Sequence, residues 1–179
     1  MQYIYIIQEK QNKDFNYYLK SNEYLKDYQE KDDLISLSFD DELLPDFIDF
    51  LNSLSNDLFW PFKAISLPFE ASEKLLNPLV EYLKNLPQNT YTMGEILINQ
   101  IKKNLPIDPV VKNYILSNVN KESVESALVF IETSSIYETS KKLYVHRNTL
   151  NYRIDTIYKK TGLNIRNMID AFVFYILFS

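Results

Sequence analysis

The chain has 179 residues, of which 46% are hydrophobic, so it can bury the core of one large domain or of two small ones. The absence of cysteine excludes disulfides and thiolate metal sites, and the formal net charge of −5 by itself argues against binding to nucleic acid. The apolar stretches near the two ends are too short for a signal peptide or a membrane span, so we expect a cytoplasmic protein without a membrane partner.

The first 85 residues mix short β-like and helical patterns, which predicts a small mixed α/β module. Tyr3–Ile7 is rich in β-branched and aromatic residues, and Leu34–Phe39 alternates between apolar and polar positions, so both are expected to be strands. Helical spacing of apolar residues predicts a helix from about Asp41 to Asp57, and Phe62–Phe69 is a third possible strand.

After this module the pattern becomes helical. Apolar residues recur at helical spacing in four segments, Ser72–Leu86, Thr92–Asn104, Pro109–Val119 and Ser123–Glu132. The predicted fold class is therefore α+β, with a mixed module over residues 1–85 that could be a degenerate sensory domain. A helical connector over residues 86–120 and an all-α domain over residues 121–179 complete the predicted division.

The charge is distributed unevenly along the chain. Residues 1–120 hold 11 lysines and no arginine against 18 acidic residues, which gives −7, whereas residues 138–166 hold 7 basic and 2 acidic residues, which gives +5. All three arginines of the protein lie in this basic stretch, and the guanidinium group suits phosphates and guanine edges. An ordinary basic helix on an acidic protein remains an equally good reading of the charge alone.

The basic stretch contains the pattern of a helix-turn-helix motif. A short helix is predicted over Tyr137–Leu143, a turn over residues 144–146, and a longer helix from about Arg147 to Thr161 that ends at Gly162. The side chains expected to face inward are Ile136, Ser140 and Leu143 on the first helix and Leu150, Ile154 and Ile157 on the second.

In such motifs the second helix lies in the major groove, with its N-terminal residues facing the base edges. Here those positions carry polar and cationic side chains of the kinds that contact bases and phosphates, namely Arg147, Asn148, Thr149, Asn151, Tyr152 and Arg153.

The string Val145-His146-Arg147-Asn148-Thr149-Leu150, followed by Tyr152-Arg153 and later by Thr161-Gly162-Leu163, resembles the C-terminal DNA-binding domain of PucR-type regulators. These include activators of purine catabolism and sugar-diacid regulators. The resemblance covers about Ser123 to Phe178 and implies a helix-turn-helix that works in a dimer. It implies that Arg147, Asn148, Thr149 and Arg153 contact DNA, whereas Tyr152 could contact DNA or pack. The family tends to have alanine where Ser140 stands.

The remaining predicted DNA contacts flank the turn. Lys141 and Lys142 end the first helix, and His146, the single histidine, precedes the second helix, where a capping or phosphate-contacting role is expected. No catalytic set, metal site, phosphate loop or cofactor motif is recognisable, so we expect no enzyme and no cofactor.

The last apolar segment, Ala171–Phe178, is apolar on all sides and needs cover on more than one face, which favours a homodimer. Double-stranded DNA is the expected partner, and an unknown small-molecule effector is possible. The alternative reading is a protein-interaction or ligand-sensing module in which the helix-turn-helix is structural.

Overall fold

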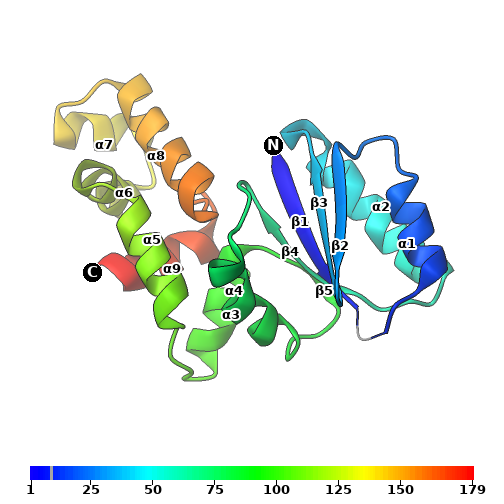
Figure 1. Ribbon diagram of the computed structural model, residues 1–179. Helices are drawn as coiled ribbons and strands as arrows, with labels where there is room; N and C mark the ends of the chain where they lie inside the picture. Colours follow the sequence, from blue (N-terminus) through cyan, green and yellow to red (C-terminus); the bar gives the residue numbers. More distant parts are fainter. Residues whose placement is uncertain (9) are drawn as a thin grey trace. The chain divides into compact units, whose positions relative to one another are not determined.

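The computed structural model describes residues 1–8 and 10–179 and confirms the α+β fold class (Figure 1). A five-stranded sheet with its helices forms the N-terminal part, and the remainder is helical. The chain divides into two compact units, Met1–Thr92 and Met93–Ser179. Across the described residues, no helix is both long enough and apolar enough to span a bilayer.

The N-terminal unit is built on one mixed sheet with the strand order β2-β3-β1-β4-β5. The strands are β1 (Gln2–Ile7), β2 (Asp27–Lys31), β3 (Leu34–Phe39), β4 (Lys63–Leu67) and β5 (Asn89–Tyr91). Strand β1 is antiparallel to both β3 and β4, β2 is antiparallel to β3, and β5 runs parallel to β4.

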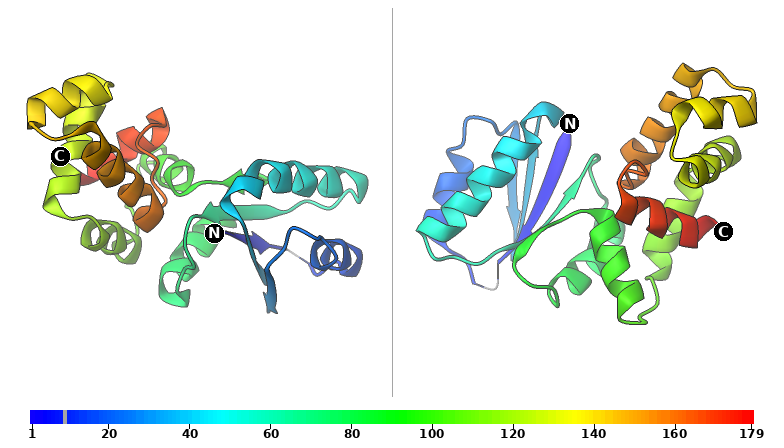
Figure 2. Two further views of the ribbon diagram at one scale, coloured as in Figure 1. Left: turned by 90° about the horizontal axis from the view of Figure 1, so that it is seen from above. Right: turned by 180° about the vertical axis from the view of Figure 1, so that it is seen from behind.

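Two helices cover one face of this sheet, α1 (Lys13–Lys20) and α2 (Leu44–Asp57), as the views in Figure 2 show. A single 3-10 turn, η1 (Asp41–Leu43), leads into α2, and its Asp41 and Glu42 lie at a helix start, where acidic side chains are favoured. Because side chains alternate along a strand, every second residue of β1, β3 and β4 points towards these helices. The buried cluster comprises Ile4, Ile6, Phe15, Leu19, Ile35, Leu37, Phe39, Phe47, Leu51, Leu54, Phe62 and Ala64.

Helix α3 (Glu73–Leu83) lies along the opposite face of the sheet. The loop before it is fixed by Tyr5 of β1, whose hydroxyl accepts a hydrogen bond from the Ala71 amide at 2.7 Å. Leu76 of α3 shares a groove with Tyr3 and Ser36, which belong to the face that α1 and α2 leave uncovered.

The C-terminal unit contains α4 (Met93–Lys102), α5 (Pro109–Asn118), α6 (Lys121–Thr133), α7 (Ile136–Leu143), α8 (Arg147–Thr161) and α9 (Met168–Phe178). Helices α6, α7 and α8 pack on one another, α5 packs against α8, and α4 packs against α9. The helices predicted from the sequence are all present, with ends displaced by a few residues.

The boundary between the units differs from the predicted division. We predicted a helical connector over residues 86–120, but β5 completes the N-terminal sheet, and α4 and α5 belong to the C-terminal unit. The physical reason is burial, because Ile96 and Leu97 of α4 and Ile115 of α5 are fully buried, with α4 packed against α9 and α5 against α8. The module over residues 1–85 therefore extends to Thr92.

Candidate nucleic-acid interface

Local hydrogen bonds define the ends of α7 and α8. Ser135 caps α7 by accepting the Glu138 amide at 3.3 Å, and Tyr144 ends this helix in a left-handed conformation with φ of 52°. His146 is extended and caps α8, because its Nδ1 accepts the Asn148 amide at 3.2 Å. The single histidine therefore has a capping role, one of the two roles expected for it.

The buried side of α8 fixes which side chains face outward. Leu150, Ile154 and Ile157 are at most 1% exposed, as the sequence predicted, and Leu163 beyond the helix is also buried. Gly162 ends the helix with φ of 75°, the left-handed conformation expected at this position. One helical face is thus committed to packing, and the opposite face is available to a partner.

The inward residue of α7 differs from the prediction. We expected Ser140 to be inward, but Thr139 is fully buried, whereas the Ser140 hydroxyl donates to the Tyr137 carbonyl at 2.8 Å. The Thr139 hydroxyl donates to the Ser135 carbonyl at 2.7 Å and lies 2.7 Å from the Thr133 hydroxyl. These bonds satisfy the buried hydroxyl and tie the end of α6 to α7.

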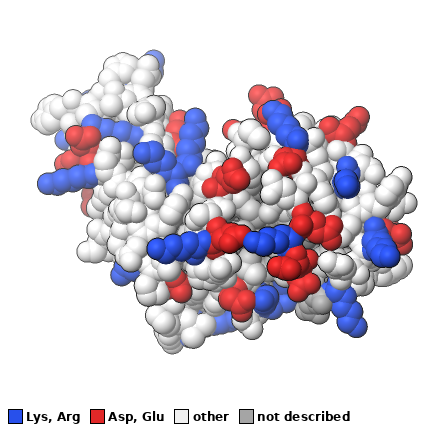
Figure 3. Space-filling view, in the orientation of Figure 1, with Lys and Arg blue, Asp and Glu red and all other residues white. Residues whose placement is uncertain are grey.

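Four consecutive predicted contact residues are exposed at the start of α8, namely His146, Arg147, Asn148 and Thr149. Tyr152, one turn further on, is 71% exposed. No acidic side chain stands in the first turn of α8. Figure 3 shows Lys and Arg side chains gathered over the part of the C-terminal unit that carries α7 and α8.

Two other predicted contacts are held by the protein itself. Arg153 is partly buried and donates through Nη1 to the Ser126 hydroxyl of α6 at 3.0 Å. Asn151 is partly buried too, and its Oδ1 accepts a hydrogen bond from Arg166 at 3.1 Å. The structure therefore does not place these two side chains on the fully exposed stripe with Asn148 and Tyr152.

The two predicted lysines at the end of α7 are both exposed. The Lys141 ammonium lies 4.4 Å from the centroid of the Tyr137 ring, which supports a cation–π contact. Lys142 lies 3.9 Å from the Glu132 carboxylate, at the outer limit of an ion pair. Both ammonium groups remain accessible to a phosphate.

Sequence reasoning missed Arg166, which lies in the loop between α8 and α9. Its Nη1 donates to Asp155 Oδ1 at 2.6 Å and its Nη2 donates to Asn151 Oδ1 at 3.1 Å. One guanidinium group therefore holds two side chains of α8. The available signal was compositional, because Asp155 is the single acid of α8 and Arg166 is the single arginine outside that helix.

A buried carboxyl group joins α9 to α4. Asp170 is 4% exposed and accepts the Asn164 amide at 2.8 Å. Burial raises the pKa of Asp170 to about 6, the Asn164 hydrogen bond lowers it in part, and the Glu95 charge raises it further. Gly94 of α4 approaches so closely that a Cβ there would lie 1.7 Å from Asp170 Oδ1.

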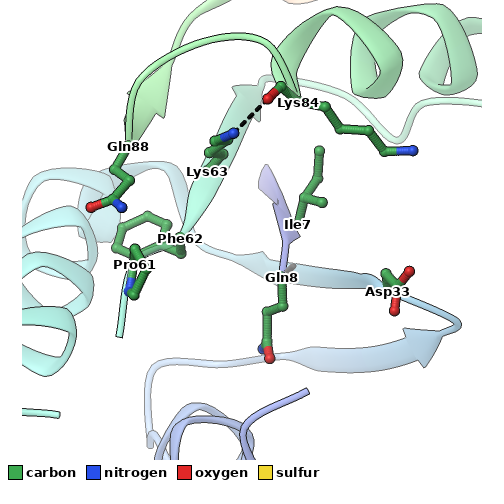
Figure 4. Close-up of a pocket in the computed structure, with 8 residues that line it drawn as sticks. All are labelled: Ile7, Gln8, Asp33, Pro61, Phe62, Lys63, Lys84 and Gln88. Atoms are coloured by element: carbon green, nitrogen blue, oxygen red, sulfur yellow. Dashed lines mark hydrogen bonds between the residues drawn. The ribbon is translucent and has the colours of Figure 1, made fainter. Parts of the chain in front are cut away.

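The N-terminal unit holds a pocket of about 330 Å³ beside the end of β1 (Figure 4). It is lined by Ile7, Gln8, Asp33, Pro61, Phe62, Lys63, Lys84 and Gln88. The Lys63 ammonium donates to the Lys84 carbonyl at 2.5 Å and so links β4 to the end of α3. Among the residues that the structure describes, no cluster of His, Cys, Asp or Glu could hold a metal ion.

A short helix, a left-handed turn and a second helix with one buried face define a helix-turn-helix domain. Residues 124–178 match the family model of the PucR C-terminal helix-turn-helix domain, so this segment is a PucR-type helix-turn-helix domain. The resemblance noted from the sequence motif is thereby confirmed for this part of the chain.

Two relatives match the chain over short segments. An uncharacterized protein, YxkF of Bacillus subtilis, is 34% identical over 64 residues, which cover 35% of this chain and 22% of that protein. The carbohydrate diacid regulator of Escherichia coli is 47% identical over 38 residues, which cover 21% of this chain and 10% of that protein. The matched segments thus span about a fifth and a tenth of the lengths of these relatives.

Among solved structures, the regulator of polyketide synthase expression from Bifidobacterium adolescentis matches with a TM-score of 0.42 and 14% identity. The match covers 98% of this chain and 77% of that one.

Proposed function

We propose that this protein is a transcriptional regulator that binds specific DNA sequences through α8. The observation that carries the proposal is the outward side of the first turns of α8, where Arg147, Asn148, Thr149 and Tyr152 are exposed and no acid stands in the first turn. Arginine and asparagine side chains read guanine and adenine edges in the major groove. The PucR-type domain supports the assignment of this helix as the recognition helix.

Phosphate contacts are assigned to the residues around the turn. Lys141 and Lys142 end α7, and His146 stands at the start of α8, where backbone amides also favour an anion. Binding is expected to weaken steeply with salt, because phosphate contacts release counterions. Arg153 and Asn151 are assigned to the same surface together with the partners that hold them, Ser126 and Arg166.

We propose that the protein acts as a homodimer and that a second copy covers the exposed side of α9. Met168 is 83% exposed, and Phe172, Tyr175 and Ile176 are between 41% and 51% exposed. Met168, Phe172 and Tyr175 border a groove of about 590 Å³ that also involves Phe130 and Ile131 of α6. An apolar patch of this kind marks an interaction surface.

The charge of this patch suits a two-fold contact, in which the same surface faces itself. Arg166 is the one charged side chain lining the groove, and its charge is already paired with that of Asp155. Two copies would therefore bring together apolar side chains without repulsion between unpaired like charges. Sedimentation should show a dimer that Phe172→Glu converts to a monomer, and a wild-type monomer at micromolar concentration would contradict the proposal.

A small-molecule effector is assigned to the N-terminal unit as part of the same proposal. The pocket beside β1 has a volume of about 330 Å³, within the range of small-ligand sites, and combines apolar walls with amide and ammonium groups. As part of the same proposal, the protein is not an enzyme, and it binds double-stranded DNA in the cytoplasm.

The deciding experiment is selection of bound duplexes from a random DNA pool by the full chain. An enriched inverted repeat, with half-sites about one helical turn apart, supports both the function and the dimer. Arg147→Ala should then weaken binding by about 1–3 kcal/mol if this side chain reads a base. Asn118→Ala, on a helix away from the turn, serves as the matched control.

Failure to enrich any duplex, with no salt-sensitive affinity for DNA, favours the second candidate function. That candidate is an interaction or ligand-sensing module with a structural helix-turn-helix. The observation in its favour is the charge of Met1–Thr92, which holds 8 lysines against 16 acidic residues, or −8, and repels DNA.

A further inference from the structure

One acidic side chain interrupts the otherwise neutral or basic outer side of α8. Asp155 stands one turn beyond Asn151 and is half-exposed, with 50% of its side-chain surface accessible. A carboxylate beside a helix that enters a groove would repel the phosphates on either side of that groove. A DNA-binding helix therefore has to neutralise this charge.

Arg166 supplies the neutralising charge from outside the helix. Its Nη1 lies 2.6 Å from Asp155 Oδ1, and its own side chain is 40% exposed. The loop that presents it is itself fixed, because the Arg166 amide donates to Asn164 Oδ1 at 3.2 Å and the Asn164 amide donates to the buried Asp170 at 2.8 Å. The guanidinium group is thus held in place by the backbone that joins α8 to α9.

The second arm of the guanidinium group acts on a predicted base contact. Nη2 donates to Oδ1 of Asn151 at 3.1 Å, so the amide oxygen is turned towards Arg166. The amide nitrogen of Asn151, with its two hydrogens, then faces the other way as a donor. In the major groove such a donor matches purine N7, guanine O6 or thymine O4, and it does not match the amino groups of adenine or cytosine.

We propose that Arg166 is a positioning residue for DNA recognition, which cancels the Asp155 charge and orients the Asn151 amide as a hydrogen-bond donor towards a base acceptor. The proposal rests on the proposed DNA-binding function and adds to it a residue outside the recognition helix. The fork of the guanidinium group is essential, because a lysine ammonium in the same place can pair with Asp155 and leave Asn151 unheld.

The test compares five variants of the full chain on the duplex selected by the wild-type protein. Arg166→Gln should weaken binding roughly tenfold, because one uncancelled carboxylate opposes the phosphates. Asp155→Asn in the same chain should restore affinity to within about threefold of the wild-type value, and Asp155→Asn alone should leave it unchanged or tighter.

Arg166→Lys separates the two roles. We expect it to keep affinity within about threefold while relaxing base preference at one operator position, the same position that Asn151→Ala relaxes. Melting temperatures within a few degrees of the wild-type value exclude a folding effect, since an exposed ion pair contributes little to stability. If Arg166→Gln does not fold, the proposal is tested by the base preference of Arg166→Lys alone.

Two results would overturn the proposal. The first is that Arg166→Gln binds the duplex as tightly as the wild-type protein. The second is that the double variant Arg166→Gln/Asp155→Asn binds as weakly as Arg166→Gln alone. The second result would mean that Arg166 contacts DNA directly or acts on folding. In both cases the wild-type protein still binds DNA, so the proposed function stands. Failure of the wild-type protein to bind any duplex would instead remove the proposed function itself.

Discussion

The two units of the chain have opposite charge and different kinds of surface. Met1–Thr92 carries no arginine and a net charge of −8, whereas Met93–Ser179 holds 11 basic and 8 acidic residues, or +3. The first unit packs helices on both faces of a sheet, and the second exposes a polar, cationic helix start beside an apolar helix. The net charge of −5 therefore describes neither unit, and nucleic-acid binding has to be judged on the C-terminal unit alone.

The largest expected effect is on the unfolding free energy of the C-terminal unit, with the N-terminal unit unaffected. Ile154→Ala removes a side chain that is 1% exposed between α8 and its neighbours, which should cost about 2–5 kcal/mol of unfolding free energy. Trp60, the single tryptophan, lies in the N-terminal unit and reports on it by fluorescence. We expect the midpoint of the circular-dichroism transition to move to a lower denaturant concentration, while the midpoint of the Trp60 fluorescence transition stays unchanged. A common shift of both signals would show that the units unfold as one.

The next effect concerns pH and is confined to the C-terminal unit. The pKa of Asp170 is raised from 3.8 to about 6 by burial, so the folded protein keeps the proton at pH values where the unfolded chain has lost it. This group therefore favours folding most below pH 4 and loses about 3 kcal/mol of that contribution as pH rises through 6. Unfolding of the wild-type protein and of Asp170→Asn should be measured at pH 4.5 and 7.5. A difference between them that does not change with pH would contradict this account.

Close packing of α4 on α9 can be tested at Gly94. A Cβ at this position would meet Asp170 Oδ1 at 1.7 Å, so Gly94→Ala should lower the unfolding free energy by about 1–3 kcal/mol. Gly162→Ala is the matched control, because its expected cost of about 1 kcal/mol comes from the left-handed backbone at this position, with φ of 75°. The clash should shrink in the Asp170→Ala background, whereas the Gly162→Ala effect should not. Equal behaviour of the two glycines in that background would rule out the contact.

The smallest effect is expected at the helix-turn-helix turn. His146→Ala removes the Nδ1 acceptor of the Asn148 amide and should cost about 1 kcal/mol of stability at neutral pH. Lys142→Ala, which breaks a contact of 3.9 Å with Glu132 at the surface, should change stability by less than about 0.5 kcal/mol. Thermal unfolding at pH 7.5 distinguishes the two. If His146→Ala is as stable as the wild-type protein, His146 does not stabilise α8 as a cap, and phosphate contact is its remaining role.

The same contrast between the units explains how much the sequence could predict. In the C-terminal unit the periodic apolar positions and the capping residues placed α8 at the observed residues, Arg147–Thr161. In the N-terminal unit β2 is a polar edge strand, and β5 has three residues, so neither carries an alternating apolar pattern long enough to predict. Helix α1 buries only Phe15 and Leu19, which is too sparse a pattern to separate from a loop.

The candidate site was predictable in part for the same reason. Exposure of residues 147–149 follows from helical phase once Leu150 and Ile154 are assigned to the core. The contacts of Arg153 with Ser126 and of Arg166 with Asp155 join residues 27 and 11 positions apart. They depend on how α6 and the loop before α9 pack, which local patterns do not specify.

The central claim, that the start of α8 enters the major groove, can be tested by DNA cleavage from a single attached chelate. Because the chain has no cysteine, Thr149→Cys and, as a control, Lys112→Cys on α5 can each be labelled at one site with iron-EDTA. We expect the Thr149 label to cut both strands of the selected duplex within each half-site, in a major-groove pattern, and the Lys112 label to cut weakly. Strong cleavage from Lys112 with none from Thr149 would contradict the account.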